Sequence, residues 1–210
     1  MRERRAAALL AAALIAVAPP PARAAPADGK PLYAGCVACH GARGEGVTAV
    51  GAPGIAGLSA AYLERQLRAF ASGARGAAAG DSQGAAMRAA TAGIRTDAQR
   101  TALAAYVASL PRVDAPSKSG DNANGRNYFN ALCSACHASN GAGNESLGAP
   151  RLAGQSAAYI ERQLADFRTG RRGAAMSDRQ GAQMRSIANM LPDAATLHDV
   201  AQYSATLAGR

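Results

Sequence analysis

The chain has 210 residues, of which 18% are charged, and a formal charge of +9 at neutral pH. With three phenylalanines, six tyrosines and no tryptophan, it has too few aromatic rings to line a basic stripe, which argues against nucleic-acid binding. The first 24 residues alone carry +3 of the charge, so a mildly basic mature protein is expected.

Residues 1–24 have the parts of a secretory signal peptide. Three arginines lie within the first five residues, residues 6–18 are apolar, and Ala22-Arg23-Ala24 fits a small-residue cleavage site. An uncleaved membrane anchor is the alternative, but 13 apolar residues are fewer than the roughly 20 that cross a bilayer. The sequence therefore predicts export to the periplasm with cleavage near Ala24, and no later stretch is expected to span a membrane.

The mature chain carries one chemical motif twice, 97 residues apart. C-x-x-C-H is the attachment sequence for c-type haem, whose cysteines bond the porphyrin and whose histidine binds the iron. A methionine follows each histidine by 47 residues, and its thioether can fill the remaining iron position. The candidate attachment residues are Cys36, Cys39, Cys133 and Cys136, and the candidate iron ligands are His40, Met87, His137 and Met184. We predict two covalently bound haem c groups.

Two other uses of paired cysteines are considered. A thioredoxin-like redox pair requires a βαβ context, whereas the segments here are rich in alanine and helix-like. A zinc site made of all four cysteines is possible by spacing, but it explains neither the adjacent histidines nor the matched methionines. Since every cysteine lies in a motif, none remains for a structural disulfide.

Each copy of the repeat predicts the same order of elements. A first helix, 29–37 or 125–134, leads into the motif, and a long glycine-rich loop, 41–57 or 138–154, follows it. An amphipathic helix then begins at a capping serine and ends at a glycine, over 59–73 or 156–170. The methionine segment comes next, and a last helix covers 97–110 or 193–207. No run alternates as a strand would, so the predicted class is all-α.

The stretch 114–124 is rich in turn-forming residues and poor in apolar ones, which is typical of a linker. It separates a first domain, 25–113, from a second domain, 125–210. Units of this size are small for a core made of protein alone, and a haem inside each would supply much of the apolar interior.

Three further residues are candidates for ligands but have no counterpart in the other copy. Met176 and Met190 align with alanine and glycine, so we interpret them as core or surface residues. His198 lies in the last helix and aligns with a threonine, and we expect it to be exposed or at an interface.

With these pieces placed, the chain resembles the dihaem cytochrome c4 family over nearly all of its mature length. The resemblance depends on the two haem motifs, on the run Pro150-Arg-Leu-Ala-Gly-Gln155, and on Met184 seven residues before Leu191. The first half matches more loosely, with Pro53-Gly-Ile-Ala-Gly-Leu58. The family implies two tandem cytochrome c-like domains, each wrapped around a covalent haem and related by a pseudo-twofold axis. It also implies haem propionates near the interface, and Pro53 and Pro150 orienting the histidines through a backbone contact.

The resemblance implies a periplasmic one-electron carrier between a respiratory donor and an acceptor such as a terminal oxidase, with possible peripheral membrane association. The alternative is an electron-transfer subunit of a dehydrogenase complex, such as a flavocytochrome c. A dihaem peroxidase would need an open iron position, which matched methionines argue against. We therefore expect redox partner proteins and no catalytic residues.

The sequence leaves open the roles of the residues that differ between the two copies and of the polar residues that repeat in both. Leu58 stands where the second half has Gln155, which removes a polar contact near its haem or at the domain interface, and Gly41 is matched by Ala138. The repeated polar residues Tyr62, Gln66, Tyr159 and Gln163 line either the haem or the interface, and Arg75 and Arg172 either pair with propionates or are exposed.

Overall fold

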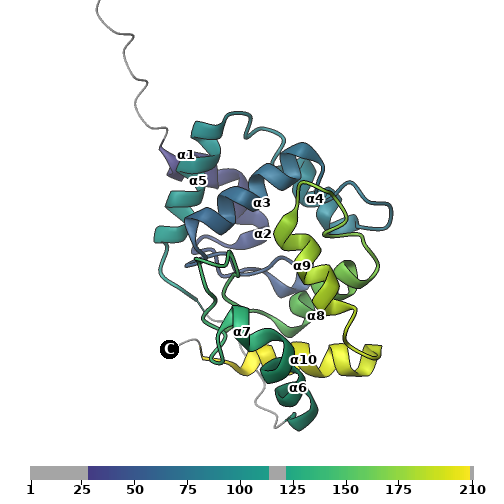
Figure 1. Cartoon of the computed structure of the whole chain (residues 1–210). Helices are drawn as coiled ribbons and strands as arrows, with labels where there is room; N and C mark the ends of the chain where they lie inside the picture. The colour runs from purple at the N-terminus through teal and green to yellow at the C-terminus, as the bar shows by residue number, and fades with distance from the viewer. Residues whose placement is uncertain (1–27, 114–121, 209–210) are drawn as a thin grey trace, which may run out of the picture.

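The structure is a computed structural model that describes residues 28–113 and 122–208. These two ranges form two helical halves, which lie one above the other in Figure 1. The predicted signal peptide and most of the predicted linker lie outside the described residues. Within the described ranges the only β pairing is two isolated bridges, Val47 with Ala52 and Asn144 with Ala149, so the all-α class is confirmed.

The two halves have the same order of helices. The first half contains α1 (Gly29–Tyr33), α2 (Val37–His40), α3 (Ala60–Ser72), α4 (Ser82–Ala90) and α5 (Asp97–Ser109), with 3₁₀ turns at Ala34–Cys36 and Thr48–Val50. The second half contains α6 (Ala123–Tyr128), a π turn (Phe129–Cys133), α7 (Ser134–His137), α8 (Ala157–Arg168), α9 (Arg179–Ala188) and α10 (Ala194–Thr206). No described helix has the length and apolar character needed to cross a membrane.

Capping side chains explain where the repeated helices begin. Ser59 and Ser156 each accept a hydrogen bond from the backbone three residues later, which starts α3 and α8 at equivalent positions. Asp81 and Asp178 do the same for α4 and α9. These two short helices carry the predicted methionine ligands, so the caps fix the place of each methionine.

The entry into the second motif differs from the prediction of one helix over 125–134. Asn122 caps α6, which begins at Ala123, so the last residues assigned to the linker belong to this helix. The helix then widens into the π turn before α7. Gly29 and Gly125 both face the last helix of their half, but their separation is 96 residues whereas the cysteines are 97 apart. The π turn therefore absorbs a one-residue insertion that precedes Cys133.

Each half has its own small core, in which the first and third helices of the half pack on its last helix. In the first half α1 and α3 contact α5, and in the second half α6 and α8 contact α10. The first core contains Tyr33, Leu63, Leu103, Ala104 and Val107. The second contains Phe129, Cys133, Ile160, Leu164, Phe167, Ala188, Leu191, Leu197, Val200 and Ala201.

Candidate haem centres and the domain interface

His40 lies at the end of α2 with only 4% of its surface exposed. Its Nδ1 donates to the carbonyl of Pro53 at 2.9 Å, while its Nε2 faces the sulfur of Met87 at 3.4 Å. Burial lowers the pKa of His40, although the bond to Pro53 opposes this. A neutral imidazole with Nε2 free to donate its lone pair is the form that binds a metal.

The second half repeats the histidine geometry. His137 is also 4% exposed, and its Nδ1 donates to the carbonyl of Pro150 at 2.8 Å. Burial again lowers the pKa of this histidine. Met184 lies on α9 where Met87 lies on α4, and it packs against the second core. The backbone contact that the resemblance implies for the two prolines is thus present in both halves.

The four cysteines lie beside the histidines, and none of them forms a disulfide. Cys39 and Cys136 are exposed, whereas Cys133 is buried in the second core. Burial, and next the neighbouring cysteine, raise the pKa of Cys36, and the same causes raise the pKa of Cys133 to about 11. Among the described residues no three His, Cys, Asp or Glu side chains gather as metal ligands, so the cysteines do not converge as a zinc site requires.

The glycine-rich loop after each motif brings the proline carbonyl to the histidine. Gly46 has a φ of +83° and donates from its backbone to the carbonyl of His40 at 2.8 Å. A Cβ at this glycine would overlap the peptide that joins Pro53 to Gly54. Gly143 occupies the same place against Pro150 in the second half. The loop therefore holds the proline carbonyl in place beside the histidine.

The two halves meet through reciprocal hydrogen bonds. Arg75 donates to Gln66 in its own half at 2.7 Å and to Gln163 of the other half at 2.8 Å. Arg172 mirrors these bonds, donating to Gln163 at 2.7 Å and to Gln66 at 3.0 Å. Such pairing of equivalent residues in both directions is what a pseudo-twofold axis produces.

Aromatic side chains complete this cluster. The Arg75 guanidinium donates to the hydroxyl of Tyr159 at 3.3 Å, and Arg172 donates to Tyr62 at the same distance. Arg172 also lies over the ring of Phe167, 4.6 Å from its centroid. Burial raises the pKa of Tyr159, but the guanidiniums of Arg75 and Arg172 outweigh it and the net shift is downward. The tyrosines and glutamines therefore line the interface, and Arg172, 8% exposed, is not the exposed arginine considered as an alternative.

A second arginine pair, missed in the sequence, crosses the interface. Arg65 donates to the carbonyl of Gly148 and Arg162 to the carbonyl of Gly51, both at 2.6 Å. The Nε atoms of both arginines are buried and have no hydrogen-bond partner among the described residues. Buried donors of this kind require an acceptor, and the propionate carboxylates of haem c are suitable ones. The repetition of both arginines in equivalent helices was the signal that could have identified them.

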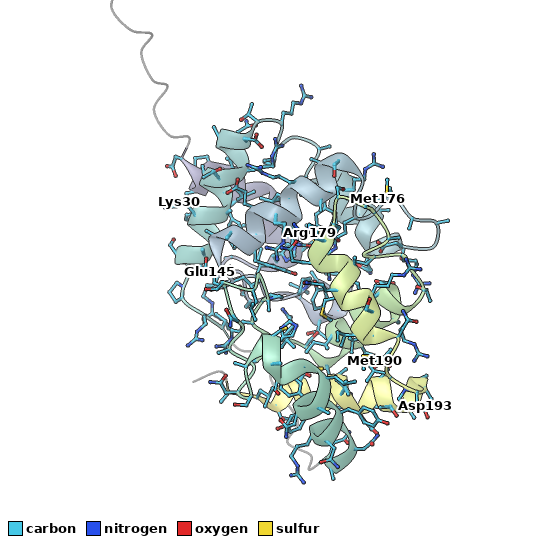
Figure 2. The ribbon with its side chains drawn as sticks, viewed as in Figure 1. Lys30, Glu145, Met176, Arg179, Met190 and Asp193 are labelled. Carbon is cyan, nitrogen blue, oxygen red and sulfur yellow. The ribbon has the colours of Figure 1, made fainter. Side chains whose placement is uncertain are left out.

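The two methionines and the histidine that were not expected to bind iron lie on the surface. Met176 is fully exposed and Met190 is 58% exposed, on either side of α9 (Figure 2). His198 is exposed on α10, with its Nδ1 2.9 Å from a carboxylate oxygen of Glu161.

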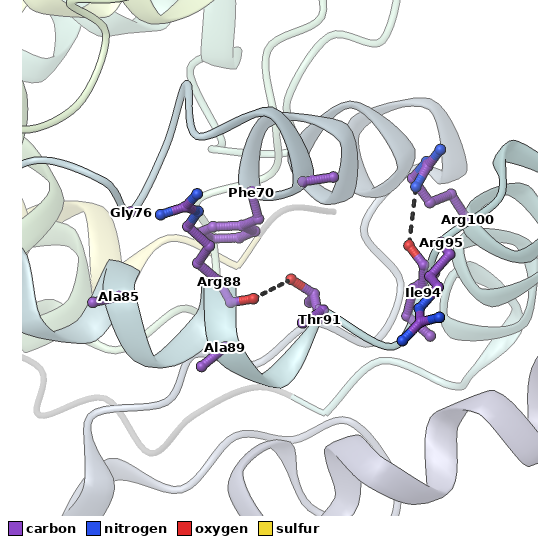
Figure 3. A pocket seen from close by; sticks show the side chains of 11 residues that line it. Phe70, Gly76, Ala85, Arg88, Ala89, Thr91, Ile94, Arg95 and Arg100 are labelled. Carbon is purple, nitrogen blue, oxygen red and sulfur yellow. Dashed lines mark hydrogen bonds between the residues drawn. The ribbon is translucent and has the colours of Figure 1, made fainter.

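The first half has an open hollow of about 590 Å³ (Figure 3). Its lining includes Phe70, Arg88, Ile94 and Arg100. Arg100 donates to the carbonyl of Ile94 at 2.9 Å, which ties the wall to α5. None of the predicted cysteines, histidines or methionines lines the hollow, although Ala85, Arg88 and Ala89 on either side of Met87 do.

Comparison with known proteins gives the family. The model of the cytochrome c family matches twice, over residues 26–111 and 122–207. The chain is 37% identical over 185 residues to a thiosulfate dehydrogenase electron acceptor of Thiomonas intermedia, covering 83% of this chain and 79% of the relative. It is 33% identical over 192 residues to cytochrome c4 of Azotobacter vinelandii, covering 87% and 88%. The crystal structure of reduced cytochrome c4 from Pseudomonas stutzeri superposes with a TM-score of 0.71 at 30% identity, covering 85% of this chain and 96% of that chain.

Two cytochrome c domains, each with a complete attachment motif, define a c-type cytochrome with two covalently bound haem c groups. The chain belongs to the cytochrome c family and, within it, to the dihaem cytochromes c4. The facing histidine and methionine of the first half, and the unpartnered arginine donors at the interface, fit this cofactor.

Proposed function

We propose that this dihaem electron carrier works in the periplasm, passing single electrons between a respiratory donor and an acceptor such as a terminal oxidase. His40 and Met87 would ligate the iron of the first haem, His137 and Met184 that of the second, and the cysteine pair of each motif would bond the porphyrin. The observation that carries the proposal is the 3.4 Å approach of His40 Nε2 to the Met87 sulfur. With a histidine and a methionine beside one another in the first half and equivalent residues in the second, both haem irons would have their protein ligand positions filled, so we infer a carrier rather than an enzyme.

The bound haem supplies a one-electron ferric–ferrous couple, and the protein sets its potential. The thioether of methionine favours ferrous iron, which raises that potential. The proline carbonyls hold each imidazole in one tautomer and one orientation, with Nε2 toward the metal. Burial of both histidines excludes water from the coordinating nitrogen.

The mature protein comprises the two domains predicted at 25–113 and 125–210, the second extended forward to the cap at Asn122. The signal-peptide pattern of residues 1–24, with a cleavage site near Ala24, supports the periplasmic location, and so does the chemistry of haem attachment, which requires reduced cysteines delivered to an otherwise oxidising compartment. The reciprocal hydrogen bonds of the interface hold the two halves together as one unit, which supports the passage of an electron from one half to the other.

Mass spectrometry and spectroelectrochemistry of the purified mature protein test this proposal. Its mass should exceed that of the chain from residue 25 by two haem masses, and both haems should remain bound after acid–acetone extraction. The oxidised protein should show the near-infrared charge-transfer band of methionine bound to ferric iron, from two haems and not one. One haem, or a high-spin spectrum without that band, would exclude the ligand assignment.

A second role, as the electron-accepting partner of a dehydrogenase, is favoured by one comparison. A relative sharing 37% identity is named as a thiosulfate dehydrogenase electron acceptor. The donor would then be a separate dehydrogenase, of the thiosulfate-oxidising or flavocytochrome type, and the present chain would still carry no catalytic residues. Rapid reduction by a purified dehydrogenase and its co-purification from the native membrane-free extract support this role. Rapid oxidation by a terminal oxidase, with no dehydrogenase bound, supports the first.

A further inference from the structure

One contact breaks the symmetry of the interface. Gln155, just before α8 in the second half, forms two hydrogen bonds with Gly54 in the first half. Its Nε2 donates to the Gly54 carbonyl at 2.8 Å, and its Oε1 accepts from the Gly54 N–H at 3.1 Å. The Oε1 also accepts from the backbone of Ser156 at 3.2 Å, which fixes the orientation of the amide.

The N–H of Gly54 belongs to the same peptide group as the carbonyl of Pro53, and this carbonyl accepts the hydrogen bond from His40 Nδ1 at 2.9 Å. A peptide that donates through its N–H becomes a better acceptor at its oxygen, because hydrogen bonds in a chain polarise one another. One continuous chain therefore runs from Gln155, through the Pro53–Gly54 peptide, to His40.

The position equivalent to Gln155 in the first half is Leu58, whose side chain can neither donate nor accept a hydrogen bond. The residue equivalent to Gly54 is Arg151. A side chain at position 58 therefore cannot make the reciprocal bonds to the peptide that holds His137. The proline–histidine bond is present in both halves, but Leu58 cannot extend it across the interface as Gln155 does.

We propose that Gln155 is a positioning residue of the second domain that tunes the haem of the first domain through the Pro53–Gly54 peptide. A stronger acceptor at Pro53 draws the Nδ1 proton of His40 and makes the imidazole a better electron donor to the metal. A better donor stabilises ferric iron, so Gln155 lowers the potential of the first haem and leaves that of the second unaffected. The inference rests on His40 being an axial ligand, as in the proposed function.

Replacement of Gln155 in the full-length holoprotein tests the relay. Gln155→Leu reproduces the side chain of Leu58 and should shift the ferric–ferrous equilibrium of the first haem toward ferrous by about two- to threefold. At 59 mV per tenfold for one electron, that is a rise of about 18–28 mV. In the reduced, diamagnetic protein the Nδ1 proton of His40 should move upfield in the NMR spectrum, while that of His137 stays in place.

Gln155→Glu separates the relay from a role in packing. A carboxylate accepts more strongly from the Gly54 N–H, so the first potential should fall and the His40 proton should move downfield. A contact that only held the halves together would shift the potential in the same direction in both variants. Tyr159→Phe removes a different contact across the interface, the hydrogen bond that the Tyr159 hydroxyl accepts from Arg75. It is the matched control and should not move the His40 proton.

The outcomes are decisive for the relay and separate from the proposed function. A His40 proton that does not move in either variant, or two haems that shift equally, would overturn the relay. If Gln155→Leu does not assemble, the downfield shift or its absence in Gln155→Glu decides alone. The low-spin methionine-ligated spectrum of the unchanged protein tests the ligand assignment separately, so a failure of the relay can be told apart from a failure of the proposed function.

Discussion

Ala138, directly after the second iron-ligand candidate, has a backbone conformation that alanine rarely adopts. Its φ is +63° and its ψ is 152°, and among the described residues it is the only non-glycine residue with a positive φ. The equivalent residue in the first half, Gly41, has a φ of +78° and a ψ of 161°. A side chain in this region costs about 1–3 kcal/mol. A glycine there would give up about 0.5–1 kcal/mol through the greater freedom of its unfolded chain, so Ala138→Gly should stabilise the protein by about 1 kcal/mol.

Guanidinium unfolding of the holoprotein, followed by helical circular dichroism, measures this change. In a thermal unfolding experiment on the same protein, the midpoint temperature should rise by about 2–4 °C if the two halves unfold as one unit. Gly41→Ala is the reciprocal control. It should be destabilising, because the new methyl group overlaps the Glu45 carboxylate in addition to the backbone strain. An Ala138→Gly protein no more stable than its parent, with an unchanged denaturant slope, would refute the argument from backbone strain.

Three other predictions concern the ligands, the cofactor and the alkaline limit. Met87→Ala or Met184→Ala should leave both haems attached but make one of them high-spin with a lower potential, whereas Met176→Ala should change neither, as absorption spectra and redox titration would show. Expression without a c-type maturation system should give an unfolded apoprotein by circular dichroism, because each core lacks its haem. Burial raises the pKa of Tyr33 to about 12, and its hydroxyl donates to the carbonyl of Gly41 at 2.6 Å. Because the unfolded tyrosine loses its proton near 10, this contribution to stability is complete below pH 10 and is lost toward pH 12. Tyr33→Phe should therefore weaken the fall in unfolding free energy over that window.

The repeat predicted the helices and the symmetric part of the site because both are encoded locally. A serine before an amphipathic run identifies the start of α3, and a motif repeated in register places two histidines equivalently. The backbone bond from each proline was expected from the family resemblance, and both distances agree with it.

Contacts between distant residues were not predictable in this way. The bond from Gln155 to Gly54 joins residues 101 positions apart, and only the packing of the halves shows which haem it serves. The π turn before Cys133 accommodates one inserted residue. The repeat was counted from the cysteines onward, so it did not reveal this insertion ahead of Cys133. The buried state of Arg172 likewise depends on acceptors from both halves.

A symmetric interface cannot by itself make the two haems different, because every bond that Arg75 makes has its counterpart at Arg172. Unequal potentials, and hence a preferred direction for electrons between the halves, require departures from the repeat. One departure lies in the central cluster, where Gln163 donates to the buried Asp166 at 3.2 Å and the first half has Ala69 in place of Asp166, and three others lie close to the histidines. They are the π turn that buries Cys133, the strained backbone of Ala138, and the hydrogen bonds from Gln155. We expect the first two of these three to act on the second haem and the third on the first, so directionality should respond to changes in these loops and at Asp166.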